Sequence, residues 1–138
     1  MRFEELTVGQ SAEFTKTVTE TDVVLYAGIT GDLNPAHIDA VSAEAGRFGG
    51  RIAHGMLSAG LISAVLGTRL PGPGTVYLSQ SLRFLRPVRI GDTVTARVEI
   101  AELLTAKRRV RLATRCVNQE GKAVLDGEAL VWVPDVGE

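Results

Sequence analysis

The side chains that could carry chemistry lie in two short segments. The chain has two histidines, His37 and His54, and His37 closes the segment 32–37, which reads DLNPAH. A carboxylate and an imidazole within reach of one water could activate it for addition to carbon, since both exchange protons. Pro35 stiffens the turn and would hold Asp32 and His37 in fixed positions. Spacing alone also allows the commoner interpretation, in which both are turn or capping residues.

His54 and Gly55 form the second candidate segment. They stand directly before the most apolar stretch of the chain, which we expect to be a helix. A helix N-terminus presents free backbone N–H groups and a partial positive charge. The Gly55 N–H could therefore hydrogen-bond a carbonyl oxygen on which negative charge develops. The residues alone equally allow a packing role for Gly55 and a backbone hydrogen bond for His54.

Other kinds of site find little support in the sequence. Two histidines and Asp32 could form a facial metal triad, but His54 is distant in sequence from the other two, so we predict no metal. A serine nucleophile would need an elbow such as G-x-S-x-G, which is missing from the sequence. Glycines 72, 74 and 91 match neither a dinucleotide-binding nor a P-loop pattern.

Length and composition indicate one globular domain spanning residues 1–138. The net charge of −1 gives no reason to expect nucleic acid or an anionic membrane as a partner. Cys116 is the single cysteine, which excludes an internal disulfide, and its place in an alternating stretch predicts a buried structural thiol. The longest apolar stretch, 56–66, is too short to cross a bilayer. We expect a cytoplasmic protein.

Helix signals dominate the first half of the chain. After an edge strand at 11–18, Thr19 is a predicted helix N-cap and Gly31 the predicted end of that helix. Residues 32–35 would then form a loop, followed by a short helix at 41–45. The stretch 56–70 is apolar on nearly all sides, which is typical of a buried helix.

The second half changes to the period of two that is typical of strands. Alternation predicts strands at 94–100 and 110–116, and further strands are expected at 76–85 and 124–133. The sheet must bury one face, and the apolar helix is the element that can cover it. We therefore predict an α+β architecture in which about five mostly antiparallel strands wrap around one central buried helix.

Four blocks of the sequence, in this order, resemble the MaoC-like hotdog family. The first is 26–37 (YAGITGDLNPAH), which resembles the hydratase 2 motif, and the second is 51–57 (RIAHGML). The others are 76–84 (VYLSQSLRF) and 87–94 (PVRIGDTV). Within the family, the chain is most similar to the short (R)-specific enoyl-CoA hydratases that supply polyhydroxyalkanoate synthesis.

The resemblance implies a hotdog fold, a homodimer whose sheets join edge to edge, and an active site near the dimer interface. It implies that Asp32 and His37 share the water that adds across the double bond of a trans-2-enoyl thioester. Asn34 would orient the loop, and the Gly55 N–H would polarise the thioester carbonyl. The substrate would be a coenzyme A thioester, with no separate cofactor.

The resemblance also suggests where the acyl chain and coenzyme A would bind. The floor of the acyl pocket would be formed by Ser63, Leu66 and Val131. Candidates for the phosphates of coenzyme A are Arg83, Arg86 and Arg89, although exposed arginines are common on strands.

Three alternatives share this fold. A dehydratase of acyl-carrier-protein thioesters would run the same reaction in reverse, and the residues do not separate it from a hydratase. A thioesterase would place an acidic residue on the central helix, and residues 55–70 contain none. A non-catalytic acyl-binding subunit would be expected to lose Asp32 or His37, and this chain has both.

Overall fold

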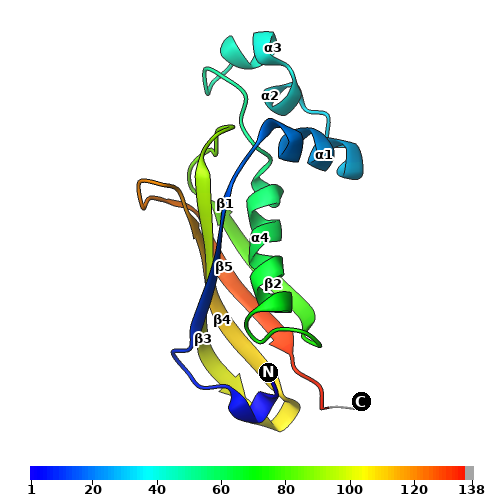
Figure 1. Ribbon diagram of the computed structural model, residues 1–138, viewed down its shortest axis with the longest axis vertical. Helices are drawn as coiled ribbons and strands as arrows, with labels where there is room; N and C mark the ends of the chain where they lie inside the picture. Colours follow the sequence, from blue (N-terminus) through cyan, green and yellow to red (C-terminus); the bar gives the residue numbers. More distant parts are fainter. Residues whose placement is uncertain (136–138) are drawn as a thin grey trace.

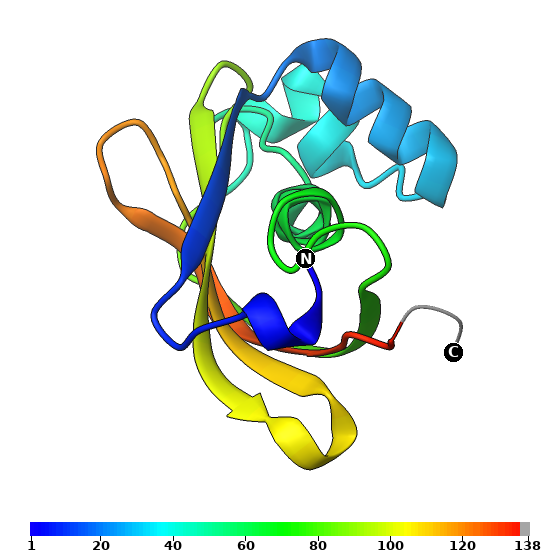
Figure 2. The same cartoon turned by 60° about the horizontal axis from the view of Figure 1, so that its bottom comes forward.

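The molecule is built on one antiparallel sheet and one long helix (Figure 1). The computed structural model describes residues 1–135. The strands, in the spatial order β1-β3-β4-β5-β2, are β1 (Ser11–Thr17), β3 (Thr93–Leu104), β4 (Arg109–Val117), β5 (Ala123–Trp132) and β2 (Val76–Phe84). The sheet curves around α4 (Gly55–Thr68), which Figure 2 shows end-on within the curve. The predicted α+β hotdog architecture is confirmed, with β1 at one edge.

The inner face of the sheet is built by the alternation seen in the sequence. On β3 the buried side chains are two apart, as Val98 and Ile100 show, and β4 alternates in the same way. The register places Ala96 opposite Cys116 and Ile100 opposite Leu112, so apolar side chains meet on the helix side. Burial raises the pKa of the Cys116 thiol to about 12, in agreement with the predicted structural role.

Helix α4 is buried on one side only. Ile62, Val65 and Leu66 face the sheet and are at most 1% exposed. On the other side Met56 is 52% exposed and Ser63 is exposed, so the expectation of a helix buried all round is wrong for a single chain. The reason is that one sheet covers only one side of a helix. Within the described part of the chain, no helix has the length and apolarity that crossing a membrane needs.

Three further helices cap the N-terminal end of α4 (Figure 1). They are α1 (Glu20–Thr30), α2 (Pro35–Ile38) and α3 (Ala40–Glu44). Thr19 caps α1 in a capping box with Asp22, and Gly31 ends the helix with φ 80°, so both predicted boundaries are confirmed. His37, expected on a loop, lies instead on α2, because Asn34 and the proline after it start a new helix.

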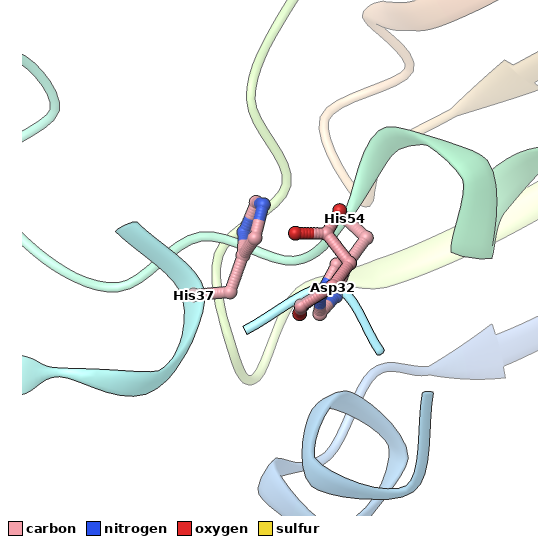
Figure 3. A group of neighbouring side chains, drawn as sticks. All are labelled: Asp32, His37 and His54. Carbon is pink, nitrogen blue, oxygen red and sulfur yellow. The ribbon is translucent and has the colours of Figure 1, made fainter. Parts of the chain in front are cut away.

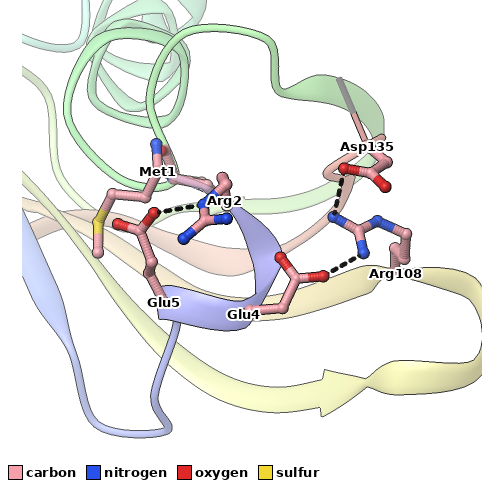
Figure 4. A network of polar contacts seen from close by, with 7 residues as sticks. Met1, Arg2, Glu4, Glu5, Arg108 and Asp135 are labelled. Atoms are coloured by element: carbon pink, nitrogen blue, oxygen red, sulfur yellow. Dashed lines mark hydrogen bonds and ion pairs between the residues drawn. The ribbon is translucent and has the colours of Figure 1, made fainter. Parts of the chain in front are cut away.

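The opposite end of the molecule holds the N-terminus in a polar network (Figure 4). The Met1 ammonium donates to the carbonyl oxygen of Pro71 at 2.7 Å. Arg108, just before β4, pairs with Glu4 at 2.6 Å and with Asp135 at 4.0 Å. These contacts tie the N-terminal segment to the β3–β4 connection and to the end of the chain that follows β5.

Candidate active site

Helices α1 and α2 and the start of α4 bring three titratable side chains together. Asp32 lies on the loop after α1, His37 on α2, and His54 immediately before α4 (Figure 3). A nitrogen or carboxylate oxygen of each lies within 4.8 Å of those of the others. Separation in the sequence was therefore a poor guide to His54, which is a neighbour of the predicted pair.

His37 is oriented by backbone contacts on both sides. Its Nδ1 donates to the carbonyl oxygen of Ile52 at 2.7 Å, since a carbonyl can only accept. That bond leaves the lone pair of the neutral ring on Nε2. Its own carbonyl oxygen accepts from Nε of Arg51 at 2.7 Å, and the side chain is only 9% exposed. His37 is thus held with one nitrogen able to accept a proton.

Asp32 sits on a tight turn that its own neighbours stabilise. Its Oδ1 accepts from the backbone N–H of Asn34 at 3.3 Å, and its N–H donates to Oγ1 of Thr30 at 3.2 Å. Asn34 then accepts from the N–H of Ala36 through Oδ1 at 3.0 Å and so caps α2. These bonds fit the orienting role predicted for Asn34, because they link the Asp32 loop to the helix that carries His37.

His54 contacts both predicted catalytic residues and is 2% exposed. Its Nε2 donates to the backbone carbonyl oxygen of Asp32 at 3.0 Å. Its ring stacks on that of His37, with centroids 3.9 Å apart and planes at 29°. The Tyr26 ring also contacts it, with a centroid distance of 4.7 Å. One side chain therefore holds the Asp32 loop and the His37 ring in a fixed relation. The sequence allowed a backbone hydrogen bond for His54 but gave no sign of these two partners.

The first turn of α4 offers free backbone donors beside these side chains. Gly55 is the first helical residue, so its N–H has no partner within the helix, and the His54 side chain does not cap it. A Cβ at Gly55 would lie 2.6 Å from Cε1 of Phe84, so any larger residue would push the ring aside. The Phe84 ring therefore fills the space beside Gly55, as in the packing role that the sequence also allowed, while the Gly55 N–H has no partner within the helix.

A cavity of about 540 Å³ joins all of these groups, within the range that small-molecule sites occupy. Asp32, His37, His54 and Gly55 line it. The remaining lining is mostly apolar, with two arginines and one serine: Arg47, Phe48, Ile52, Ala53, Met56, Ser58, Phe84, Leu85, Arg86, Pro87, Val88, Val124 and Leu125. An apolar cavity with a few convergent proton-exchanging groups suits an uncharged acyl group that reacts with water.

The residues predicted for the acyl pocket do not line this cavity. Leu66 and Val131 are buried in the core at 1% and 0% exposure, and Ser63 is on the open side of α4. Among the described residues that line the cavity, none of these three is found. Their assignment to the acyl chain stays a prediction.

Of the three arginines predicted to contact the phosphates of coenzyme A, only one lines the cavity. Arg86 lines the cavity, whereas Arg83 pairs with Asp126 at 3.0 Å and lines a different surface hollow. Arg89 donates to the carbonyl oxygen of Phe48 and is not among the lining residues. Arg47 does line the cavity and was missed, because the sequence gives no sign that the segment after α3 returns to the site.

Whether Asp32, His37 and His54 could hold a metal depends on their free lone pairs. Two of the four imidazole nitrogens are already bound to backbone carbonyls. A metal would have to use the other two and the Asp32 carboxylate. The donor set is possible in kind, and the prediction of a metal-free site stays a prediction.

Comparison with known proteins places this arrangement in a family. A family model described as a MaoC like domain matches residues 3–123. The chain is 55% identical over 135 residues to an (R)-specific enoyl-CoA hydratase of Rhodospirillum rubrum, covering 98% of this chain and 93% of that one. It is 57% identical over 132 residues to a 3-hydroxybutyryl-CoA dehydratase of Methylorubrum extorquens, covering 96% and 83%. The unliganded R-hydratase PhaJ1 of Pseudomonas aeruginosa superposes with a TM-score of 0.92 at 53% identity, covering 97% and 86%. The chain belongs to the MaoC-like family.

Proposed function

We propose that this protein hydrates trans-2-enoyl-CoA to (R)-3-hydroxyacyl-CoA, in a reversible reaction. The observation that carries the proposal is the cavity in which a carboxylate, an imidazole lone pair and a free helix N-terminus meet. The names of the similar proteins supply the substrate class and the stereochemistry, since they act on enoyl-CoA or 3-hydroxybutyryl-CoA.

In the proposed mechanism, Asp32 and Nε2 of His37 hold one water against the β-carbon of the enoyl group. The water oxygen bonds to the β-carbon while one of its protons passes to this pair. The electron pair of the double bond moves toward the thioester carbonyl, and a proton then returns from the pair to the α-carbon. Every atom of the water ends in the product, so the reaction needs no cofactor besides the thioester itself.

The head of α4 would supply the charge relief. Negative charge collects on the thioester oxygen as water adds, and the Gly55 N–H, together with the positive end of the helix, would stabilise it. The apolar lining of the cavity strengthens this effect, because an electrostatic interaction is larger where water is excluded.

Coenzyme A would enter past the arginines of the cavity. Arg47 and Arg86 both line it, and Nη1 of Arg86 donates to the carbonyl oxygen of Ala123, which leaves its other donors available. We propose that these two arginines contact the phosphates of coenzyme A. A cytoplasmic location and a place in polyhydroxyalkanoate supply remain predictions from the sequence.

The proposal includes a homodimer. Strand β2 is a sheet edge whose outer side is unpaired among the described residues, and its side chains are largely exposed, with Leu78 at 41% and Phe84 at 55%. An apolar edge of this kind, beside the open side of α4, is suited to pairing with a second copy. Because Phe84 also lines the cavity, the site would lie near that interface.

Loss of crotonyl-CoA absorbance, with chiral analysis of the product, tests the activity. We expect formation of the (R)-3-hydroxy product with no release of free thiol. Thiol release would indicate a thioesterase, and no turnover of any chain length would indicate a binding subunit. Turnover of the acyl-carrier-protein thioester alone would assign the dehydratase.

Light scattering tests the dimer. We expect the mass of two chains for the wild type and of one chain for Leu78→Glu, which places a charge on the exposed edge. A wild-type monomer that turns over crotonyl-CoA at full rate would contradict a site that depends on the interface.

A further inference from the structure

Ser58 has a buried hydroxyl that the mechanism above does not use. The residue is 1% exposed and lines the cavity, and its Oγ has no hydrogen-bond partner within residues 1–135. Burying an unsatisfied hydroxyl costs free energy, so such groups are rare unless a ligand satisfies them. The side chain therefore has the properties of a ligand contact.

Two other helical hydroxyls show what Ser58 could have done instead. Thr30 donates to the carbonyl oxygen of Tyr26 at 2.8 Å, and Thr68 donates to that of Ala64 at 2.6 Å. Both bonds reach back four residues along a helix, which is the usual way to satisfy a hydroxyl there. The Ser58 hydroxyl makes no such bond, so its donor is unused among the described residues. Its oxygen is closed to solvent in the free protein, and a rotation of the side chain would turn it to the cavity that Ser58 lines.

The position of Ser58 on α4 directs this donor toward the head of the helix. Gly55 and Ser58 are three residues apart and so lie on one face. A helical Cβ tilts toward the helix N-terminus, which brings the Ser58 hydroxyl toward the turn that carries the Gly55 N–H. The two donors therefore serve the same part of the cavity.

We propose that the Ser58 hydroxyl is a second hydrogen-bond donor to the thioester carbonyl oxygen, beside the Gly55 N–H. This inference rests on the proposed hydratase function. The hydroxyl forms no covalent bond and transfers no proton. It adds charge relief where the oxygen becomes negative, and so contributes most in the transition state.

The competing explanation is structural. The Nδ1 of His54 is also buried and unpartnered among the residues that the structure describes, and it lies one turn before Ser58. A rotation of the serine side chain could direct its hydroxyl to that nitrogen. In that case Ser58 would position His54, and its removal would destabilise the protein.

The substitution Ser58→Ala separates these explanations by activity and stability together. As a substrate contact, Ser58 is unsatisfied in the free enzyme, so we expect an unchanged or higher Tm and a kcat for crotonyl-CoA lower by roughly 10- to 100-fold. Thr75→Val is the matched control, because Oγ1 of Thr75 is also buried and unpartnered among residues 1–135 but lies outside the cavity lining. We expect it to keep full activity.

Ligand affinity distinguishes a contact with the carbonyl from a purely structural role of Ser58. Ser58→Ala should weaken the binding of butyryl-CoA, which has the thioester carbonyl, by about 10-fold. The affinity for S-butyl-CoA, a thioether without the carbonyl, should stay unchanged. Equal weakening of both ligands, a lower Tm, or full activity would each overturn the proposal. Ser58→Cys, which keeps the shape and a weak donor, serves if the alanine variant does not fold. An inactive wild type would instead refute the hydratase function.

Discussion

The two ends of helix α4 differ in how the chain satisfies its polar groups. At the C-terminal end, the Met1 ammonium and Arg108 have partners at 2.6 to 2.7 Å (Figure 4). At the N-terminal end, Nδ1 of His54 and Oγ of Ser58 are buried without partners among residues 1–135. Asp32, His37 and His54 line the cavity there, and Figure 3 shows these three side chains close together. Oγ1 of Thr75, which follows α4, is also buried without a partner among the described residues, but Thr75 does not line the cavity, whereas His54 and Ser58 do. The two ends therefore differ in that unpartnered polar groups adjoin a cavity at the N-terminal end.

The largest effect should come from isosteric changes at the N-terminal end. Asp32→Asn and His37→Gln should each lower kcat for crotonyl-CoA by on the order of 10²- to 10⁴-fold, since each removes a proton acceptor from the water. Glu4→Gln makes the same kind of change at the other end and should leave kcat unaltered. Circular dichroism should show the same fold for all three variants. Full activity of either site variant would refute its assigned role.

The next effect should come from His54. His54→Phe keeps a ring to stack on His37 but loses the bond to the Asp32 carbonyl, whereas His54→Gln offers a donor without a ring. If His54 positions both groups, each variant should lower kcat by about 10-fold with little change in KM. Should one variant be fully active, the contact that it lacks is dispensable.

A smaller effect is expected from the cavity arginines. Arg47→Ala and Arg86→Ala should each raise KM for crotonyl-CoA by about 5-fold, because exposed charge pairs are weak. The KM for crotonyl-pantetheine, which lacks the nucleotide phosphates, should not change. Arg83→Ala is the control, since Arg83 pairs with Asp126 away from the cavity. Equal rises for both substrates would exclude a phosphate contact.

The smallest effect concerns the stability of the opposite end. The hydrogen bond from Arg108 lowers the pKa of Glu4, so the pair stabilises the fold at neutral pH and loses this contribution as acid protonates Glu4. Glu4→Gln should lower Tm at pH 7 by less than about 3 °C, and the difference from wild type should disappear at low pH. A difference that grew as the pH fell would have the wrong sign.

Much of the fold was predictable because local signals and packing agree. The alternation that ends at Ile100 and Cys116 specified a half-buried sheet, and Thr19 and Gly31 marked the ends of α1. The side of α4 away from the sheet was not predictable. Small residues such as Ser63 and Ala64 give the same sequence pattern whether they are covered by this chain or by a second copy.

The site was predictable where its residues are close in sequence. Asp32 and His37 lie on one segment, and their turn could be inferred from Pro35. A backbone hydrogen bond of His54 was among the possibilities that the sequence offered, but its contacts with Asp32 and His37 were not. Arg47 was missed, and in both cases the reason is that only the tertiary fold brings these residues to the same cavity. Ser58 carries no signal at all, since a serine in an apolar helix is common and its significance comes from the hydrogen bond that it does not make.

The central claim is that Asp32 and His37 act together on one water, and a double-mutant cycle tests it most directly. The measurement is kcat for crotonyl-CoA in Asp32→Asn, His37→Gln and the double variant. If both hold the same water, kcat of the double variant should lie within about 10-fold of kcat of the slower single variant. The reason is that the effects of groups that act as a unit are not additive. Losses that multiply fully in the double variant would contradict the claim.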